Sequence, residues 1–390
     1  MAAEPISLAL PPPGPALDEL LATIPDTPAV FLLTATGGQP YLSKSALLGR
    51  RLRRLLKADD KRRAALNLRG LVERVQYWPT NSRLESAVLF YQLARHHHPD
   101  NYVKLCNLRM PSYMRLLTRT AFPRTQVTVR PAARGIAFGP FRSRASAEEF
   151  EKATLELFQV RRCQDDLDPH PDHPGCIYGE MAQCLRPCQD AVTRDEYQSE
   201  VGRLVEFLST EGRSLMETVE RMRDRFSADM EFEEAARQHR RIEKIQSVWR
   251  QRDELATGAA TMNGVAVLKS QIPNTVTLIF LLDGAWVAPI ELNLLPVDGH
   301  PISLDRRLRE LVESQTPPLI AQSERAEHLA ILARWFYSTW RDGEWLNFPT
   351  PQSLSYRKLV NMVHRATQEF PDPVTPPPPL SSQINPHLLP

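Results

Sequence analysis

The chain lacks the features that would place it in a membrane or outside the cell. No stretch of it approaches the roughly 18 consecutive apolar residues that a membrane-spanning helix needs. The first residues, MAAEPISLALPPPG, contain no basic segment, and prolines interrupt their short apolar run, so they do not resemble a secretory leader. We therefore expect a soluble, cytoplasmic protein with no membrane partner.

Glycine motifs for nucleotide binding are missing as well. The sequence contains neither a Walker motif nor a dinucleotide-binding fingerprint, and no glycines are arranged as a phosphate cradle. This absence excludes the common P-loop and dinucleotide-dependent enzymes, so any catalytic chemistry must come from another kind of site.

Acidic residues are absent from one long stretch, and this makes the charge distribution uneven. Residues 101–147 hold nine basic side chains and no Asp or Glu, and residues 44–63 hold nine basic residues against two acids. Acidic residues collect further on, around 165–172 and 216–234, so that the formal net charge is only +2. A basic front half favours a polyanionic partner such as DNA, with ordinary solvated faces as the alternative.

Four of the five cysteines lie close together, in the pattern C-x12-C-x7-C-x3-C. Four thiolates at this spacing can bind one metal centre, either a tetrahedral zinc ion or an iron–sulfur cluster. Disulfides are disfavoured in a protein that is not exported. We therefore predict a metal site, with unliganded structural or redox cysteines as the alternative. The four residues are Cys163, Cys176, Cys184 and Cys188.

The 390 residues are too many for one ordinary core, and the patterning predicts an α+β multidomain chain. Strand-like runs at Ala29–Thr34 and Val75–Thr80 and a helical pattern at Arg83–His97 indicate a small α/β domain. Helix breaks near Thr210–Gly212 and Ser227–Met230 indicate a charged helical hairpin. The predicted blocks are 17–105 (the α/β domain), 106–192 (basic and cysteine-containing), 193–255 (hairpin), 256–370 (a C-terminal α/β domain) and 371–390 (a Pro-rich tail).

Several of these stretches resemble the UvrC family of bacterial excision-repair nucleases. AVF at 29–31 and YLSK at 41–44 occupy the places of the family's GIY and YIG-K elements. FGPF at 138–141 and LFQVRRC at 157–163 are similar to the family's approach to its first cysteine, and the cysteine spacing matches to within one residue. MEFEEAARQHRRI at 230–242 resembles the UVR motif. The resemblance covers about residues 20–340 and implies a GIY-YIG-like first domain and a C-terminal domain like the middle region of UvrC.

The GIY-YIG nuclease of that family hydrolyses a phosphodiester with one divalent metal ion, and the resemblance assigns its residues here. Phe31 and Tyr41 stand at the two tyrosine positions, and Lys44 and Arg51 match the lysine and arginine. Phe90 stands where the family has its metal-binding glutamate, and a phenyl ring cannot bind a metal. We therefore expect impaired incision.

Other carboxylates and imidazoles do not readily replace the missing ligand. Glu85 lies five residues before Phe90, which rotates it by about 140° around a helix. The run His96–His98 is a further candidate, although three histidines at a helix end are more often a solvated surface. Whether the chain is an enzyme therefore stays open at this point, and an active Mg- or Mn-dependent endonuclease making a single incision is the alternative.

The resemblance also implies a cofactor and partners. It favours a [4Fe–4S] cluster over zinc at the cysteines, because zinc sites usually use C-x2-C pairs. It implies a UvrB-type protein partner and DNA backbone contacts, and an iron–sulfur DNA-binding sensor unconnected with repair is a second alternative. The family's RNase H-like domain has no counterpart in residues 260–370, so we expect a truncated relative. The residues assigned to the protein partner are Phe232, Glu233, Ala235, Ala236 and Arg237, and those assigned to DNA are Arg50, Arg53, Arg54 and Lys57.

Overall fold

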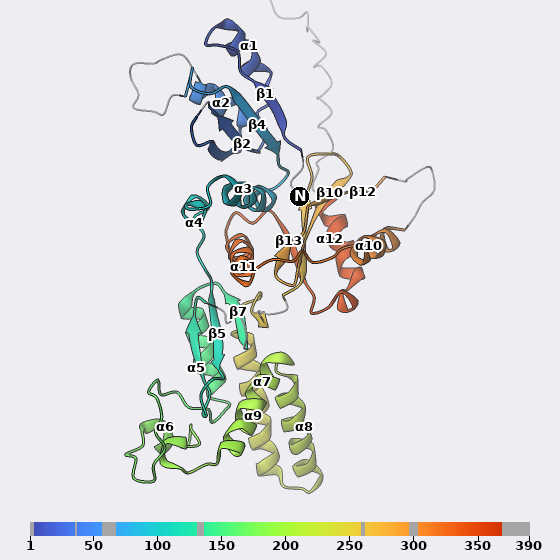
Figure 1. Ribbon diagram of the computed structural model, residues 1–390. Helices are drawn as coiled ribbons and strands as arrows, with labels where there is room; N and C mark the ends of the chain where they lie inside the picture. Colours follow the sequence, from blue (N-terminus) through green and yellow to red (C-terminus); the bar gives the residue numbers. More distant parts are fainter. Residues whose placement is uncertain are drawn as a thin grey trace, which may run out of the picture.

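The computed structural model describes residues 4–35, 37–56, 68–130, 136–258, 262–295 and 303–368. They form three antiparallel sheets with helices in an elongated molecule (Figure 1). The N-terminal sheet lies at one end, the helical hairpin lies at the other, and the C-terminal sheet stands beside the first. This confirms a mixed α+β fold. Lys57 and the Pro-rich tail lie outside the described residues, and no described helix is long and apolar enough to cross a membrane.

The N-terminal sheet has the strand order β1-β4-β2-β3. Its central strand β2 reads AVFLLT and is buried on both faces because helices cover both sides of the sheet. Helices α1 and α2 cover one face, and α3 covers the other. The elements are β1 (Ile6–Ala9), α1 (Pro15–Thr23), β2 (Ala29–Thr34), β3 (Tyr41–Ser45), α2 (Leu48–Leu56), β4 (Arg74–Pro79), α3 (Arg83–His97) and the short α4 (Tyr102–Leu105).

Helix α3 is apolar on two sides because it lies between two domains (Figure 1). Phe90 and Ala94 pack against the N-terminal sheet. Leu84, Val88 and Tyr91 belong instead to a core that includes α11 of the C-terminal domain. The helix is therefore part of both cores.

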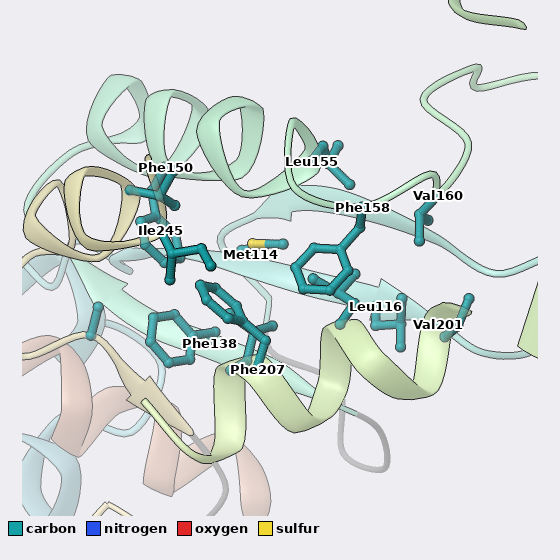
Figure 2. Close-up of a cluster of buried hydrophobic side chains, with 14 of the residues drawn as sticks. Met114, Leu116, Phe138, Phe150, Leu155, Phe158, Val160, Val201, Phe207 and Ile245 are labelled. Atoms are coloured by element: carbon teal, nitrogen blue, oxygen red, sulfur yellow. The ribbon is translucent and has the colours of Figure 1, made fainter. Parts of the chain in front are cut away.

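The middle of the molecule is a sheet of order β6-β5-β7-β8, in which β8 arrives from beyond the hairpin. Figure 2 shows how its core forms: Met114 and Phe138 on the strands meet Phe150 of α5, Phe207 of α7 (Arg194–Ser209) and Ile245 of α9 (Phe232–Arg250). The start and end of the helical segment are thus fixed to one sheet. The elements are β5 (Ser112–Leu117), β6 (Arg124–Thr128), β7 (Ala137–Phe141), α5 (Arg144–Leu155) and β8 (Thr257–Gly258).

The expected helix breaks are confirmed, and the segment forms three helices. Helix α7 begins with a capping box, in which the Thr193 hydroxyl and the Glu196 carboxylate satisfy each other's backbone amides. Helices α8 and α9 then form the hairpin. The elements are α6 (Ile177–Glu180), η1 (Pro187–Gln189), α7 (Arg194–Ser209), α8 (Arg213–Ala228) and α9 (Phe232–Arg250).

The C-terminal domain is a sheet of order β11-β10-β9-β13, with β12 also paired to β10. Helices α10 and α12 pack on one face, and α11 packs on the other, next to α3. The elements are β9 (Gly264–Lys269), β10 (Thr275–Leu282), β11 (Ala285–Trp286), β12 (Ile290–Asn293), α10 (Leu304–Glu313), α11 (Gln322–Phe336), β13 (Gly343–Asn347), η3 (Pro351–Ser353) and α12 (Tyr356–Gln368).

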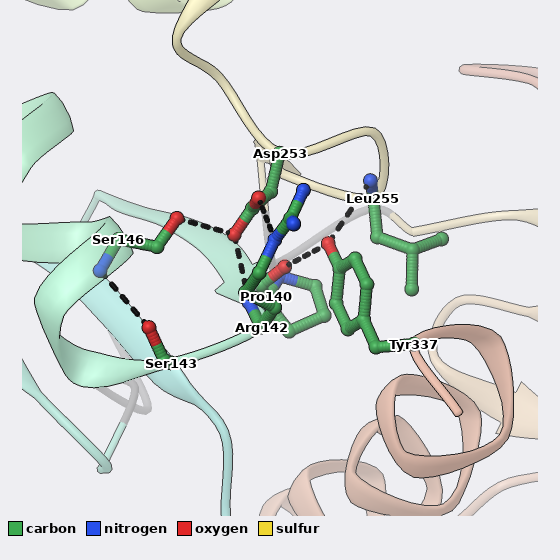
Figure 3. Close-up of polar contacts among 7 residues, drawn as sticks. All are labelled: Pro140, Arg142, Ser143, Ser146, Asp253, Leu255 and Tyr337. Atoms are coloured by element: carbon green, nitrogen blue, oxygen red, sulfur yellow. Dashed lines mark hydrogen bonds and ion pairs between the residues drawn. The ribbon is translucent and has the colours of Figure 1, made fainter. Parts of the chain in front are cut away.

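The FGPF stretch joins the middle sheet to the C-terminal domain (Figure 3). The Tyr337 hydroxyl donates to the Pro140 carbonyl at 3.0 Å. The buried Asp253 carboxylate accepts from the backbone and guanidinium of Arg142, at 2.8 and 2.6 Å. At Gly139, where φ is +152°, a Cβ would lie 2.6 Å from the Tyr113 ring. The motif therefore has a structural role at this junction.

Candidate functional site

The structure divides the five GIY-YIG-like residues between the two faces of the N-terminal sheet. Phe31, Tyr41 and Arg51 share the face covered by α1 and α2. Arg51 Nη2 donates to the Tyr41 hydroxyl at 3.3 Å, and the Phe31 and Tyr41 rings have centroids 6.2 Å apart. A phenol and a guanidinium thus remain together, but the residue beside them is a fully buried phenyl ring.

Lys44 and Phe90 meet on the opposite face of the sheet, which α3 covers. Lys44 belongs to β3, and Phe90 belongs to α3 itself. The Lys44 ammonium lies 5.4 Å from the centroid of the Phe90 ring. Phe90 is 6% exposed and packs with apolar residues of β2 and β3, among them Val30 and Leu42. A residue in the metal-ligand position is therefore part of the hydrophobic core.

The protein atoms around Lys44 also change its titration. Its side chain reaches solvent at the edge of the domain, yet its environment lowers the pKa of the ammonium group. The main cause is desolvation by the surrounding protein, and the Arg334 charge acts in the same direction. Among the described residues, no carboxylate forms an ion pair with Lys44.

Glu85 forms hydrogen bonds at the start of α3 and does not lie in a metal site among the described residues. Its carboxylate accepts from the Asn81 amide at 2.6 Å, while its own amide donates to the Ser82 hydroxyl at 3.0 Å. Ser82 is thus the N-cap of α3, and the Glu85 carboxylate binds the backbone amide one residue before that cap. Burial raises the pKa of the Glu85 carboxyl group. Within the described part of the chain, no three histidine, cysteine or acidic side chains are arranged to hold a single metal ion, and this includes the run His96–His98.

The arginines of α2 are only partly available to DNA. Arg53 pairs with Asp26 at 3.0 Å and also donates to the Leu21 carbonyl. Arg50 and Arg54 are exposed. The basic surface of this helix therefore consists of Arg50 and Arg54 in the described residues.

The four clustered cysteines line one small cavity. Cys184 and Cys188 are buried, Cys163 and Cys176 are half-buried, and all four thiols are free. The segment that carries them, residues 159–192, has only one short α-helical turn and one 3-10 turn as regular structure. A long segment with little regular structure usually needs a cross-link or a bound metal to order it. The four cysteines are placed where a bound metal would order this segment.

The thiols influence one another. Burial raises the pKa of Cys184 to about 11, and the neighbouring thiols contribute to the same direction. Burial is also the first cause of the raised pKa of Cys188, followed by Cys176 and Cys163. The thiolate forms therefore need a compensating positive centre.

One residue at this site was missed by sequence reasoning, although it lies in the quoted RRC. The buried Arg161 places Nη1 3.6 Å from the Cys163 sulfur and 2.8 Å from the Asp165 carbonyl oxygen. Its backbone amide donates to the Tyr197 hydroxyl at 2.9 Å. Arg161 thereby connects the first cysteine to α7.

The tip of the hairpin exposes apolar side chains. Phe232 is 67% exposed and Met230 is 75% exposed. Of the other assigned partner residues, Glu233 and Ala236 are exposed and Ala235 is half-buried. The last of them, Arg237, pairs with Glu234 at 2.9 Å. Met230 is not among the residues assigned to the partner, but it lies in the turn between α8 and α9 and adds to the same surface.

Comparison with known proteins gives the class. The family model of the UvrC/Cho excinuclease middle domain matches residues 112–207. This match covers the basic, cysteine-containing region and α7. The chain is a relative of the UvrC/Cho excinucleases.

More particularly, the chain is a low-identity homologue of UvrABC system protein C over about 90% of its length. The protein of that name from Moorella thermoacetica is 26% identical over 356 residues, which cover 89% of this chain and 57% of the relative. The one from Acetivibrio thermocellus is 23% identical over 363 residues, or 90% and 57%, and the one from Symbiobacterium thermophilum is 27% identical over 364 residues, or 90% and 57%. The chain thus spans less than two thirds of the length of these relatives. No solved structure matches it.

Proposed function

We propose that the chain is a UvrC-like nucleotide excision repair protein that binds DNA and a UvrB-type partner, and that its GIY-YIG-like site incises DNA poorly. The similarity to proteins named UvrABC system protein C supports the repair role. The observation that carries the loss of incision is the burial of Phe90, with Lys44 over its ring, where the family has a metal-binding carboxylate. A missing metal anchor removes several kcal/mol of transition-state stabilisation, and this lowers the rate by orders of magnitude.

The paired Tyr41 and Arg51 support the second candidate, an endonuclease that makes one incision. A guanidinium 3.3 Å from a phenol hydroxyl is a pair that can act on water and phosphate. This candidate needs a rearranged metal ligand, and no such ligand group is found among the described residues.

A nicking assay on damaged duplex DNA with Mg²⁺ or Mn²⁺ tests the proposal. We expect the protein and its Arg51→Ala variant to give the same background. Metal-dependent nicking that is lost in Arg51→Ala would contradict the impaired-incision proposal. The double variant Phe31→Tyr/Phe90→Glu restores the two groups that the family has at these positions. A gain of metal-dependent nicking in this variant would confirm that Phe31 and Phe90 are the cause of the impaired incision.

We further propose that the four cysteines hold a [4Fe–4S] cluster, with zinc as the alternative metal. Four thiols around one cavity support this, because each iron of such a cluster takes one thiolate and the thiolates need not converge on one point. When bound, the cluster supplies positive charge for the thiolates and one-electron redox chemistry. Retained binding to a UvrB-type protein would argue against a sensor role unconnected with repair.

A further inference from the structure

A second polar site lies between the N-terminal and the C-terminal domain, away from the Tyr41–Arg51 pair. It is a pocket of about 1190 Å³, including its open mouth, and we call it the interdomain pocket. Its walls include Lys44 from β3, Thr80 and Arg83 around the start of α3, and Arg334 and Trp340 from the C-terminal domain.

The pocket carries more positive than negative charge. Lys44, Arg83 and Arg334 line it against one carboxylate, Asp342. That carboxylate is already engaged, because it accepts from the Arg83 amide at 2.5 Å and from the Trp335 indole at 2.9 Å. The cations therefore have little compensation from the protein.

Arg334 is held in position by the backbone. Its Nη1 donates to the carbonyl oxygens of Cys106 and Asn107, at 3.0 and 3.1 Å. These bonds use one nitrogen of the guanidinium, and the other two have no hydrogen-bond acceptor among the described residues. Lys44 has the Phe90 ring on one side. Desolvation first, and then the nearby Arg334 charge, lowers the pKa of its ammonium group. An anion between the two cations would remove this repulsion.

Thr80, another residue of the pocket wall, has an unpartnered hydroxyl. Thr80 is 1% exposed, and its Oγ1 is buried and lacks a hydrogen-bond partner among the described residues. A buried hydroxyl without a partner costs free energy. A ligand oxygen would satisfy it, and this observation is independent of the charges.

We propose that the interdomain pocket binds a phosphate group of a nucleic-acid backbone between Lys44 and Arg334. Arginine and lysine are the side chains that recognise phosphate most often. The pocket edge at Ser45 and Ala46 leads directly into α2 and its exposed Arg50 and Arg54, so an extended polyanion fits better than an isolated ion. The inference rests on the proposed DNA binding and adds to it that the C-terminal domain contributes a contact.

The test uses the full chain and two matched double variants. Lys44→Gln/Arg334→Gln removes the two pocket cations, and Arg357→Gln/Lys358→Gln removes an arginine and a lysine from the exposed surface of α12. DNA affinity is measured by fluorescence anisotropy across a salt series. We expect the pocket variant to bind about tenfold more weakly, with the slope of log affinity against log salt reduced by about one, and the α12 variant to bind like the parent.

Equal losses in the two double variants, or no loss in the pocket variant, would overturn the pocket. If the pocket variant unfolds, the DNA affinity of the single variant Lys44→Gln tests the pocket instead. This variant should fold, because the Lys44 side chain reaches solvent. If the parent chain binds no DNA, the proposed function fails, and inorganic phosphate then tests the pocket separately. Phosphate should raise the melting temperature of the parent and the α12 variant but not of the pocket variant, and a rise in none of them would refute the site.

Discussion

Phe90 shows how one side chain determines the chemistry of its neighbours. The Lys44 ammonium lies 5.4 Å from the centroid of the Phe90 ring, so a carboxylate at this position would give it an acidic neighbour. With a phenyl ring, the same ammonium has a cation–π contact and no acid, so it remains available to an external anion. The proposed loss of a metal ligand and the absence of a counter-ion beside Lys44 in the described residues therefore have the same cause, Phe90.

The cysteines allow a prediction at the same scale. Cys184→Ser should remove one buried ligand, so the protein purified without oxygen should lose its bound iron and sulfide. Without the cluster, residues 159–192 should also become sensitive to limited proteolysis, because little regular structure fixes them.

Cys106→Ser is the matched control for this experiment. Cys106 is the fifth cysteine, and it packs beside α3 and away from the other four. This variant should keep its metal content. Iron retained in Cys184→Ser, or zinc in place of iron in the parent protein, would contradict the assigned cluster.

How much of the site can be predicted from sequence depends on how local it is. The cysteines lie in one short segment, so their spacing alone brings them together as candidates. Tyr41 and Lys44 are three residues apart on a strand, and alternation predicts that they face opposite sides. The family motif nevertheless places Tyr41 and Lys44 in one site. Arg334 could not be predicted at all, because its place beside Lys44 depends on the packing of α11 against α3.

At the scale of whole elements, different parts of the hairpin of α8 and α9 serve folding and binding. Its buried residues, such as Val219 and Ile242, lie toward the middle sheet, whereas the tip carries Met230 and Phe232 in solvent. Exposed apolar side chains at a turn contribute nothing to the fold and suit a protein partner.

Phe232→Glu should therefore weaken binding to a UvrB-type protein without unfolding the hairpin. Removing an aromatic anchor from an interface typically costs about 2 kcal/mol, or roughly 30-fold in affinity. Isothermal titration calorimetry with the purified UvrB-type protein measures this change in affinity. Leu319→Glu makes the same kind of change at a fully exposed position outside the hairpin and should have no effect on the affinity. Unchanged affinity in Phe232→Glu would remove the tip from the interface.

The helices and strands themselves are easier to predict from sequence than the elements they pack against. Strand β2 and helix α3 follow the expected ranges closely, because their apolar patterns are strong. Yet α3 has apolar residues on two sides, and a sequence pattern cannot say which neighbour each side contacts. The second neighbour, α11, lies at the other end of the chain.

At the scale of the whole molecule, the contact between α3 and α11 is a buried polar network as well as an apolar core. The hydroxyls of Tyr91 and Tyr102 both donate to Glu327. His328 accepts from the Trp286 amide at 3.0 Å, and burial lowers the pKa of its imidazole to about 4. Glu324 lies beside it and pairs with Arg95 of α3.

This network predicts a loss of stability in mild acid. His328 is neutral in the folded protein and takes up a proton near its ordinary pKa only when the chain unfolds, so its contribution is lost as pH falls from about 6.5 towards 4. For this group the free energy of unfolding should be about 2 kcal/mol lower at pH 5 than at pH 7.

Urea unfolding of the parent, of His328→Gln and of the exposed-site control His364→Gln measures the effect. His328→Gln should lose this part of the pH dependence, and the control should keep it. An identical pH dependence in the parent and His328→Gln would show that His328 titrates normally in the folded protein.

The position of α3 has a consequence for dissecting the protein. A chain cut after residue 105 would keep the whole N-terminal sheet but would expose Leu84, Val88 and Tyr91, which are now covered by the C-terminal domain. A chain that begins at residue 106 would leave the matching face of α11 uncovered. We therefore expect the N-terminal and C-terminal domains to unfold as one cooperative unit, and neither to fold well as a separate fragment.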